Sequence, residues 1–180
     1  MLNAYVLWVT NNPILSAVIQ FGLLGTTGEA ISLSLKNKKV SLPGTWFQTF
    51  LKVIAWAVLG VIIKIGFTGM KGFVSALIEH QLLPASFGKG FFWAFSVSVI
   101  TNVLFGPQMM AFHRLEDNLI MRQKGFDGIV LAWKTLIWFW IPAHTITFLL
   151  PAQFQIGLAA LWSIALGIIM GTTKQVKAEP

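Results

Sequence analysis

Ionisable side chains inside long apolar stretches are the residues of this sequence best suited to chemistry. Glu29 lies in GLLGTTGEAIS, and His144 follows Pro142 by two residues in WKTLIWFWIPAHTITFLLP. Lys64 and Lys134 also interrupt apolar runs. An ionisable group at membrane depth is costly and marks a functional site by default. We therefore take Glu29, Lys64, Lys134 and His144 as candidates for a polar path. Pro142 is the candidate hinge, because it lacks the N–H that would pair with a carbonyl one turn back.

Packing roles are the alternative for these groups. A neutral His144 can hydrogen-bond to a neighbouring helix and fix its position. Glu29 can pair with Lys36, seven residues later on the same helix face, near the membrane edge. The sequence leaves both interpretations open.

A second cluster has the residue types of a metal site. His113 precedes Glu116 by three residues and Asp117 by four, so all three can meet on one helix face. A di-metal helix bundle would need a matching second set of ligands, which the sequence lacks. We expect local salt bridges on an interfacial helix here, and no metal.

No sequence signature of an enzyme is present. The chain has no Ser/His/Asp set, no H-E-x-x-H motif, no Walker loop and no glycine-rich nucleotide fingerprint. The His113 cluster is the one group that could do acid–base work within a membrane. We expect no catalytic activity and no cofactor.

Composition predicts an integral membrane protein with one domain. Of its 180 residues 56% are hydrophobic and 11% are charged, whereas a soluble domain carries about 25% charged residues. The net charge of +7 comes from basic residues that flank the apolar segments. This pattern is typical of cytoplasmic loops beside anionic lipid and argues against nucleic-acid binding. The chain has no cysteine, which excludes disulfides and thiolate ligands.

The fold class that follows is all-α, a polytopic transmembrane bundle of about five spans with an amphipathic interfacial helix. One helix over residues 46–83 would be about 57 Å long, far beyond a hydrocarbon core of about 30 Å. We therefore expect a break near Gly66 and Gly69, and another at Gly106-Pro107. The expected spans are residues 13–35, 46–67, 90–104, 129–150 and 154–171, with amphipathic segments at 69–83 and 107–123.

Charge and small residues predict orientation and association. Five spans place most basic residues on one side, which should be cytoplasmic, with the N-terminus outside and the C-terminus inside. The host membrane would be the bacterial cytoplasmic membrane, or an organelle inner membrane in a eukaryote. A ladder of small residues in the last span favours close packing, either within the bundle or in a homo-oligomer. The ladder consists of Ala159, Ser163, Gly167 and Gly171.

Several segments together resemble a known family. The residues that carry the resemblance are Tyr5, Pro13, Gly28, Glu29, Gly69, Trp140, Pro142, Phe148, Pro151 and Trp162. Their order resembles the family of the twenty-two-kilodalton peroxisomal membrane protein, which includes a mitochondrial inner-membrane relative. Glu29 stands where the family has aspartate, Met70 where it has proline, and Thr147 where it has asparagine. These departures suggest a distant, prokaryotic branch. The resemblance implies four spans and a channel-like protein that modulates permeability.

Two functions therefore stand side by side. In the first, the chain is a small channel-like protein or a modulator of membrane permeability to small solutes or ions. In the second, it is a non-channel membrane subunit or scaffold that binds a partner complex. The contact surfaces would then be the small-residue ladder and the amphipathic segment 107–123.

Overall fold

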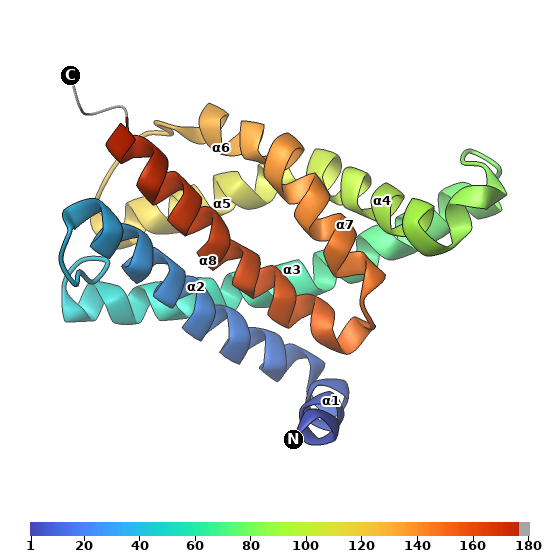
Figure 1. Ribbon diagram of the computed structural model, residues 1–180, viewed down its shortest axis with the longest axis horizontal. Helices are drawn as coiled ribbons and strands as arrows, with labels where there is room; N and C mark the ends of the chain where they lie inside the picture. Colours follow the sequence, from blue (N-terminus) through green and yellow to red (C-terminus); the bar gives the residue numbers. More distant parts are fainter. Residues whose placement is uncertain (177–180) are drawn as a thin grey trace.

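The computed structural model describes the backbone of residues 1–176 and the side chains of residues 1–166 and Ile168. Every regular element in this part of the chain is a helix, which confirms the predicted all-α class (Figure 1). The α-helices are α1 (Leu2–Asn11), α2 (Pro13–Asn37), α3 (Trp46–Glu79), α4 (Gly90–Ile100), α5 (Gly106–Met121), α6 (Ile129–Thr135), α7 (Ile141–Leu149) and α8 (Ala152–Val176). Three short helical segments join them: the 3₁₀ turn η1 (Ala85–Gly88) and the π-helical turns η2 (Thr101–Phe105) and η3 (Leu136–Trp140).

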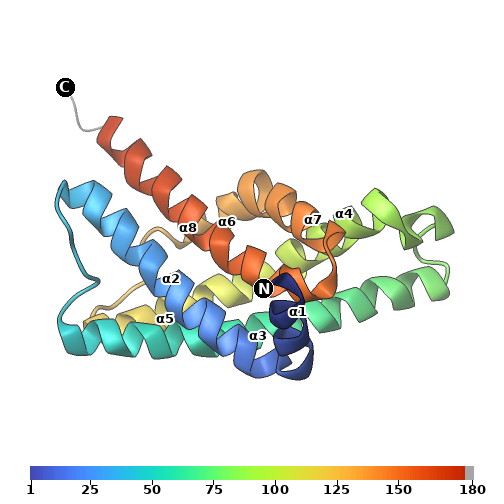
Figure 2. The same cartoon turned by 60° about the horizontal axis from the view of Figure 1, so that its bottom comes forward.

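Helix α3 is one unbroken helix of 34 residues, which runs along the length of the molecule (Figure 2). The predicted division into a span at 46–67 and a separate segment at 69–83 was therefore wrong. A helical glycine costs only about 1 kcal/mol relative to alanine, which the surrounding apolar residues of α3 can offset. The capping box at the start of α3, in which Thr45 and Gln48 satisfy each other's backbone N–H groups, adds to its stability.

The length of α3 is compatible with a bilayer. Lys52 and Lys71 are separated by 18 residues, which span about 27 Å at about 1.5 Å per residue. That length matches a hydrocarbon core of about 30 Å. Both ends of α3 then extend beyond the apolar layer.

The third span also differs from expectation, whereas the run Ile129–Leu149 agrees with the fourth expected span, residues 129–150. Gly106-Pro107 does not end a helix, because α4, η2 and α5 form one helical run from Gly90 to Met121. The π-helical turn η2 ends two residues before the proline. It accommodates the missing N–H by widening one turn. The same arrangement occurs at η3, which ends two residues before Pro142, the candidate hinge. Gly106 packs against Leu136, so the two π-helical turns lie close together.

Four helical runs among the described residues are long and apolar enough to cross a membrane. This supports the prediction of a membrane protein. Helix α8, where the fifth span was expected, contributes only the shorter apolar stretch Ala152–Leu166 among the described residues. The four runs are Pro13–Asn37, Trp46–Glu79, Gly90–Met121 and Ile129–Leu149.

The bundle is built on two packed groups. Helix α2 packs between α3 and α8, and α4 packs against α7 (Figure 1). Ala159 of the small-residue ladder is 2% exposed and belongs to the core of the bundle, so it serves internal packing. The side chains at Gly167 and Gly171 lie outside the described residues.

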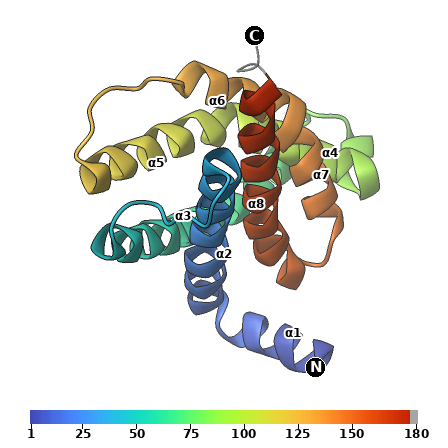
Figure 3. The same ribbon diagram turned by 60° about the vertical axis from the view of Figure 1, so that its left-hand side comes forward.

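Helix α1 turns away from the N-terminal end of α2 (Figure 3). It is attached through Tyr5, whose hydroxyl donates a hydrogen bond of 2.9 Å to Gln20 Oε1 and whose ring stacks on Phe154. Partial burial raises the pKa of Tyr5, an effect that the bond to Gln20 opposes. The phenol therefore holds α1 to both α2 and α8.

Candidate functional site

Six side chains of α2, α3 and α5 form a charged cluster, which consists of Glu29, Lys52, Trp56, His113, Glu116 and Asp117. Lys52 is its centre and is only 4% exposed. Its ammonium nitrogen Nζ lies 3.1 Å from Glu29 Oε2 and 2.5 Å from Asp117 Oδ1. A buried ammonium needs such partners, because its desolvation costs several kcal/mol.

The two aromatic members of the cluster, Trp56 and His113, lie near Oε1 of Glu29. The indole nitrogen of Trp56 donates a hydrogen bond of 2.8 Å to Glu29 Oε1. The ring centroid of Trp56 lies 4.5 Å from that of His113. Gly25 makes room for the indole, because a Cβ at this position would collide with the Trp56 ring. The glycine of α2 thus helps to fix the Glu29 carboxylate.

His113 lies between two carboxylates without a close hydrogen bond to either. Its Nε2 is 3.8 Å from Glu29 Oε1, and its Nδ1 is 3.8 Å from Glu116 Oε2. Both His113 Nδ1 and Glu116 Oε2 are buried and have no hydrogen-bond partner among the described residues. Unpartnered polar atoms of this kind are uncommon in folded proteins and call for an explanation.

The charged cluster carries excess negative charge and borders an open cavity. It contains three carboxylates against one ammonium, so a neutral His113 leaves a formal charge of −2. A cavity of about 360 Å³ is lined by Glu29 and Lys52, together with Pro43 and Gly44 of the α2–α3 loop. Small solutes can therefore approach the cluster from this end of the bundle.

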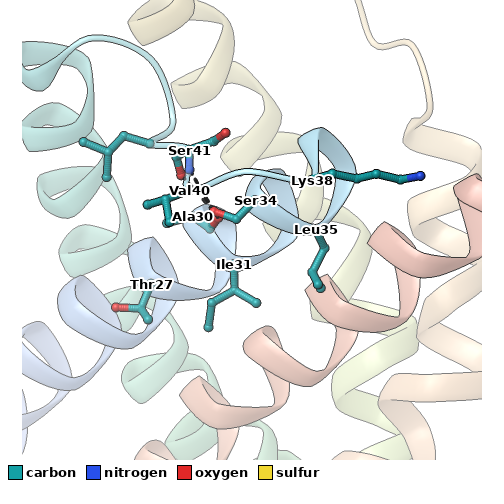
Figure 4. Close-up of a pocket in the computed structure, with 9 residues that line it drawn as sticks. Thr27, Ala30, Ile31, Ser34, Leu35, Lys38, Val40 and Ser41 are labelled. Carbon is teal, nitrogen blue, oxygen red and sulfur yellow. Dashed lines mark hydrogen bonds between the residues drawn. The ribbon is translucent and has the colours of Figure 1, made fainter.

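A larger hollow of about 700 Å³ lies beside the last turns of α2. Figure 4 shows Ser34 and Ser41 facing each other within it, while the Lys38 side chain extends away. The backbone N–H of Ser41 donates a hydrogen bond of 2.9 Å to Ser34 Oγ. This hollow holds the α2–α3 loop against α2 and has no cluster of ionisable groups.

The four candidates for a polar path lie in different surroundings. Glu29 belongs to the charged cluster, whereas Lys134 is exposed on α6 and Lys64 is half-buried on α3. His144 lies on α7 in an aromatic setting. No hydrogen bond, ion pair or ring contact among the described residues joins any two of these four. A path through all four remains a prediction.

His144 joins α7 to the two helices that face it. Its Nδ1 lies 3.1 Å from Asn102 Nδ2 in η2, a geometry in which the amide donates to the imidazole. Its ring contacts Phe67 of α3 with a centroid separation of 5.2 Å, as well as Trp140 and Phe148 on its own chain segment. These contacts are typical of a packing residue.

Replacement of His144 by alanine should therefore destabilise the protein. We expect the free energy of unfolding to fall by about 1–3 kcal/mol, because the ring contacts and the Asn102 bond are lost together. Thermal unfolding in detergent, followed by circular dichroism, would measure the loss. His80→Ala is the control, because His80 is exposed after the end of α3. Equal stability of the two variants would contradict the packing role.

The sequence identified some cluster members and missed others. It singled out Glu29 and the trio of His113, Glu116 and Asp117, but assigned the trio to surface salt bridges. It missed Lys52, although this lysine interrupts the apolar face of a span just as Lys64 does. The alternative pairing of Glu29 with Lys36 does not occur, because Glu29 pairs with Lys52 of α3.

Many residues that carry the family resemblance lie at contacts between helices. Trp162 of α8 donates a hydrogen bond of 3.1 Å to Thr147 Oγ1 of α7. Gly28 allows close approach of α2 to α8, because a Cβ there would lie 3.2 Å from the Ile164 backbone. Gly69, in contrast, has no heavy atom within 4 Å of such a Cβ.

Comparison of the chain with protein-family models, curated proteins and solved structures gives no match. The resemblance to the peroxisomal membrane protein family therefore stays a prediction.

Proposed function

We propose that this chain is a small channel-like protein that controls the passage of small ions or solutes across its membrane. The charged cluster is its ion-binding entrance. The observation that supports this proposal is Lys52, a buried cation held by two carboxylates in a bundle of apolar helices. Ionisable groups of membrane proteins usually mark ion or solute pathways, and charged side chains at a pore determine its selectivity.

The depth of the cluster fits an entrance better than the centre of a pore. Lys52 lies six residues after the start of α3 at Trp46, or about 9 Å along the helix axis. The neighbouring cavity is lined by loop residues at this end of the bundle, namely Leu42, Pro43 and Gly44 after α2, and Met121 and Gln123 at the end of α5. Ions would reach the cluster from the end of the bundle at which the basic loops gather.

The π-helical turns supply a place for movement. They interrupt two adjacent helical runs and precede Pro107 and Pro142. The runs meet next to these turns, where Gly106 packs against Leu136. Such turns are frequent at functional sites because their backbone bonds are less regular. Pro142 thereby keeps its proposed role as a hinge.

Orientation and location follow from the same proposal. The loops after α2 and α5 lie at one end of the bundle and carry Lys38, Lys39, Arg122 and Lys124. The positive-inside rule would make this end cytoplasmic and place the N-terminus outside. The C-terminus would lie inside if α8 crosses the membrane as a fifth span. The proposed host is the bacterial cytoplasmic membrane. We propose no catalytic activity and no cofactor.

Ion flux into liposomes tests the proposal. Purified protein should admit a small cation reported by a fluorescent indicator, and Glu29→Gln should slow this flux roughly tenfold. The magnitude reflects the enrichment of counter-ions by a charged lining, which is roughly tenfold or more. Glu79→Gln is the matched control, because Glu79 is exposed at the far end of α3. It should retain the wild-type flux.

Two results would contradict the proposal. The first is equal flux through both variants, which would remove Glu29 from the path. The second is no flux above that of empty liposomes from folded, inserted protein. The second result would favour the partner-binding subunit, whose contact surfaces would be α5 and α8.

A further inference from the structure

We propose that the charged cluster is a binding site for a divalent transition metal, with Glu29, His113 and Asp117 as its ligands. Lys52 occupies the position of the ion when no metal is bound. The inference names a ligand of the site on which the proposed function depends, but it can be tested without any measurement of flux.

The positions of the three ligands support this inference. Each of the three residues offers one donor atom, and these atoms all lie within 4.8 Å of one another. His113 and Asp117 lie one turn apart on α5, and Glu29 faces them from α2. Bonds of about 2.0–2.2 Å to one ion require donor pairs closer than about 4.4 Å. Small side-chain rotations would achieve this separation.

The surroundings of His113 support the inference independently. A histidine that binds a metal through one ring nitrogen usually donates the other N–H to a carboxylate. His113 directs Nε2 toward Glu29 and Nδ1 toward Glu116, each at 3.8 Å. Neither His113 Nδ1 nor Glu116 Oε2 has a hydrogen-bond partner in the part of the chain that the structure describes. A bound metal would draw the imidazole ring toward Glu29 and Asp117, and the Nδ1–H group would then donate to Glu116 Oε2.

Charge explains the role of Lys52. Its ammonium contacts Glu29 and Asp117, two of the three ligands, and so neutralises the charge that a metal would neutralise. The adjoining cavity of about 360 Å³ can accommodate the displaced ammonium group, and it admits water that would complete the coordination of the metal ion. One imidazole with two carboxylates suits zinc, cobalt, iron or manganese better than magnesium or calcium.

The sequence predicted no metal because a second set of ligands was missing. The fold supplies the missing ligand from a distant part of the chain, since Glu29 precedes His113 by more than eighty residues. Packing of α2 and α5 against the same part of α3 brings the ligands together.

Titration of the full, untagged chain in detergent with Co²⁺ tests the proposal. We expect saturable visible absorption bands with one ion per chain, confirmed by calorimetry with Zn²⁺. His113→Gln should abolish the bands or weaken binding more than about 100-fold, and Glu116→Gln should weaken it about 10–100-fold. His80→Gln is the matched control and should bind as the wild type does. Lys52→Met should tighten binding by about tenfold or more, because a competing positive charge is removed.

Two outcomes would overturn the metal site. One is the absence of saturable binding in both the wild type and Lys52→Met when circular dichroism shows both to be folded. The other is binding that His113→Gln leaves unchanged. If Glu29→Gln slows ion flux while no metal binds, the metal site fails and the proposed function stands. If metal binds with these effects while liposomes show no flux, the metal site stands and the proposed channel function fails.

Discussion

Replacement of Lys52 by methionine should lower the free energy of unfolding by about 3 kcal/mol in the presence of a chelator. Methionine fills the space of the lysine stem but leaves Glu29 and Asp117 facing each other without a cation. Breaking a buried ion pair by removing one partner costs about 3–5 kcal/mol. We expect the lower end of this energy range because the side chains of Glu29 and Asp117 are 20% and 25% exposed, so water partly solvates the unpaired carboxylates.

Thermal unfolding in detergent would measure this effect. Lys89→Met is the control, because Lys89 is exposed in the α3–α4 loop and its replacement should change little. If Lys52→Met is as stable as the control, then Lys52 does not compensate the buried carboxylates. Added Zn²⁺ should restore stability to Lys52→Met, because an ion that binds only the folded state stabilises it.

Replacement of Gly60 by alanine should also be strongly destabilising. A Cβ at Gly60 would lie 2.5 Å from the Ala17 carbonyl oxygen and 2.7 Å from Phe21 Cβ. The first of these is a backbone atom of α2, so relief requires α2 and α3 to separate. Overpacking of this kind costs typically about 1–3 kcal/mol, occasionally more, and we expect a value near the upper limit.

Gly69→Ala provides a matched comparison on the same helix. A Cβ there has no heavy atom within 4 Å, and alanine favours a helix over glycine by about 1 kcal/mol. Gly69→Ala should therefore be neutral or slightly stabilising in the same unfolding measurement. The close crossing of α2 and α3 would be contradicted if Gly60→Ala were as stable as Gly69→Ala.

The helical class could be predicted from the sequence because the features that indicate it lie within single segments. Apolar runs, charge depletion and the prolines that open helices can all be recognised within one segment. The lengths of α3 and of the run from α4 to α5 could not be predicted in this way. Gly69 and Gly106-Pro107 permit a break, but whether a helix breaks there depends on what packs against it, as Leu136 packs against Gly106.

The charged cluster could be predicted only in part, because some of its members lie close together in the sequence and others do not. Helical spacing brings His113 and Asp117 together, and Glu29 is conspicuous in an apolar segment. That Glu29 faces them, with Lys52 between, depends on how α2 and α5 pack against α3. A lysine in an apolar span has no local signal that separates Lys52, which is buried and paired, from Lys134, which is exposed.

The most direct test of the central claim is single-channel current from the purified protein in a planar bilayer. We predict discrete openings in the wild type and a lower cation conductance in Glu29→Gln, with Glu79→Gln unchanged. A silent bilayer that contains correctly folded and oriented wild-type protein would contradict the claim that this chain controls ion passage.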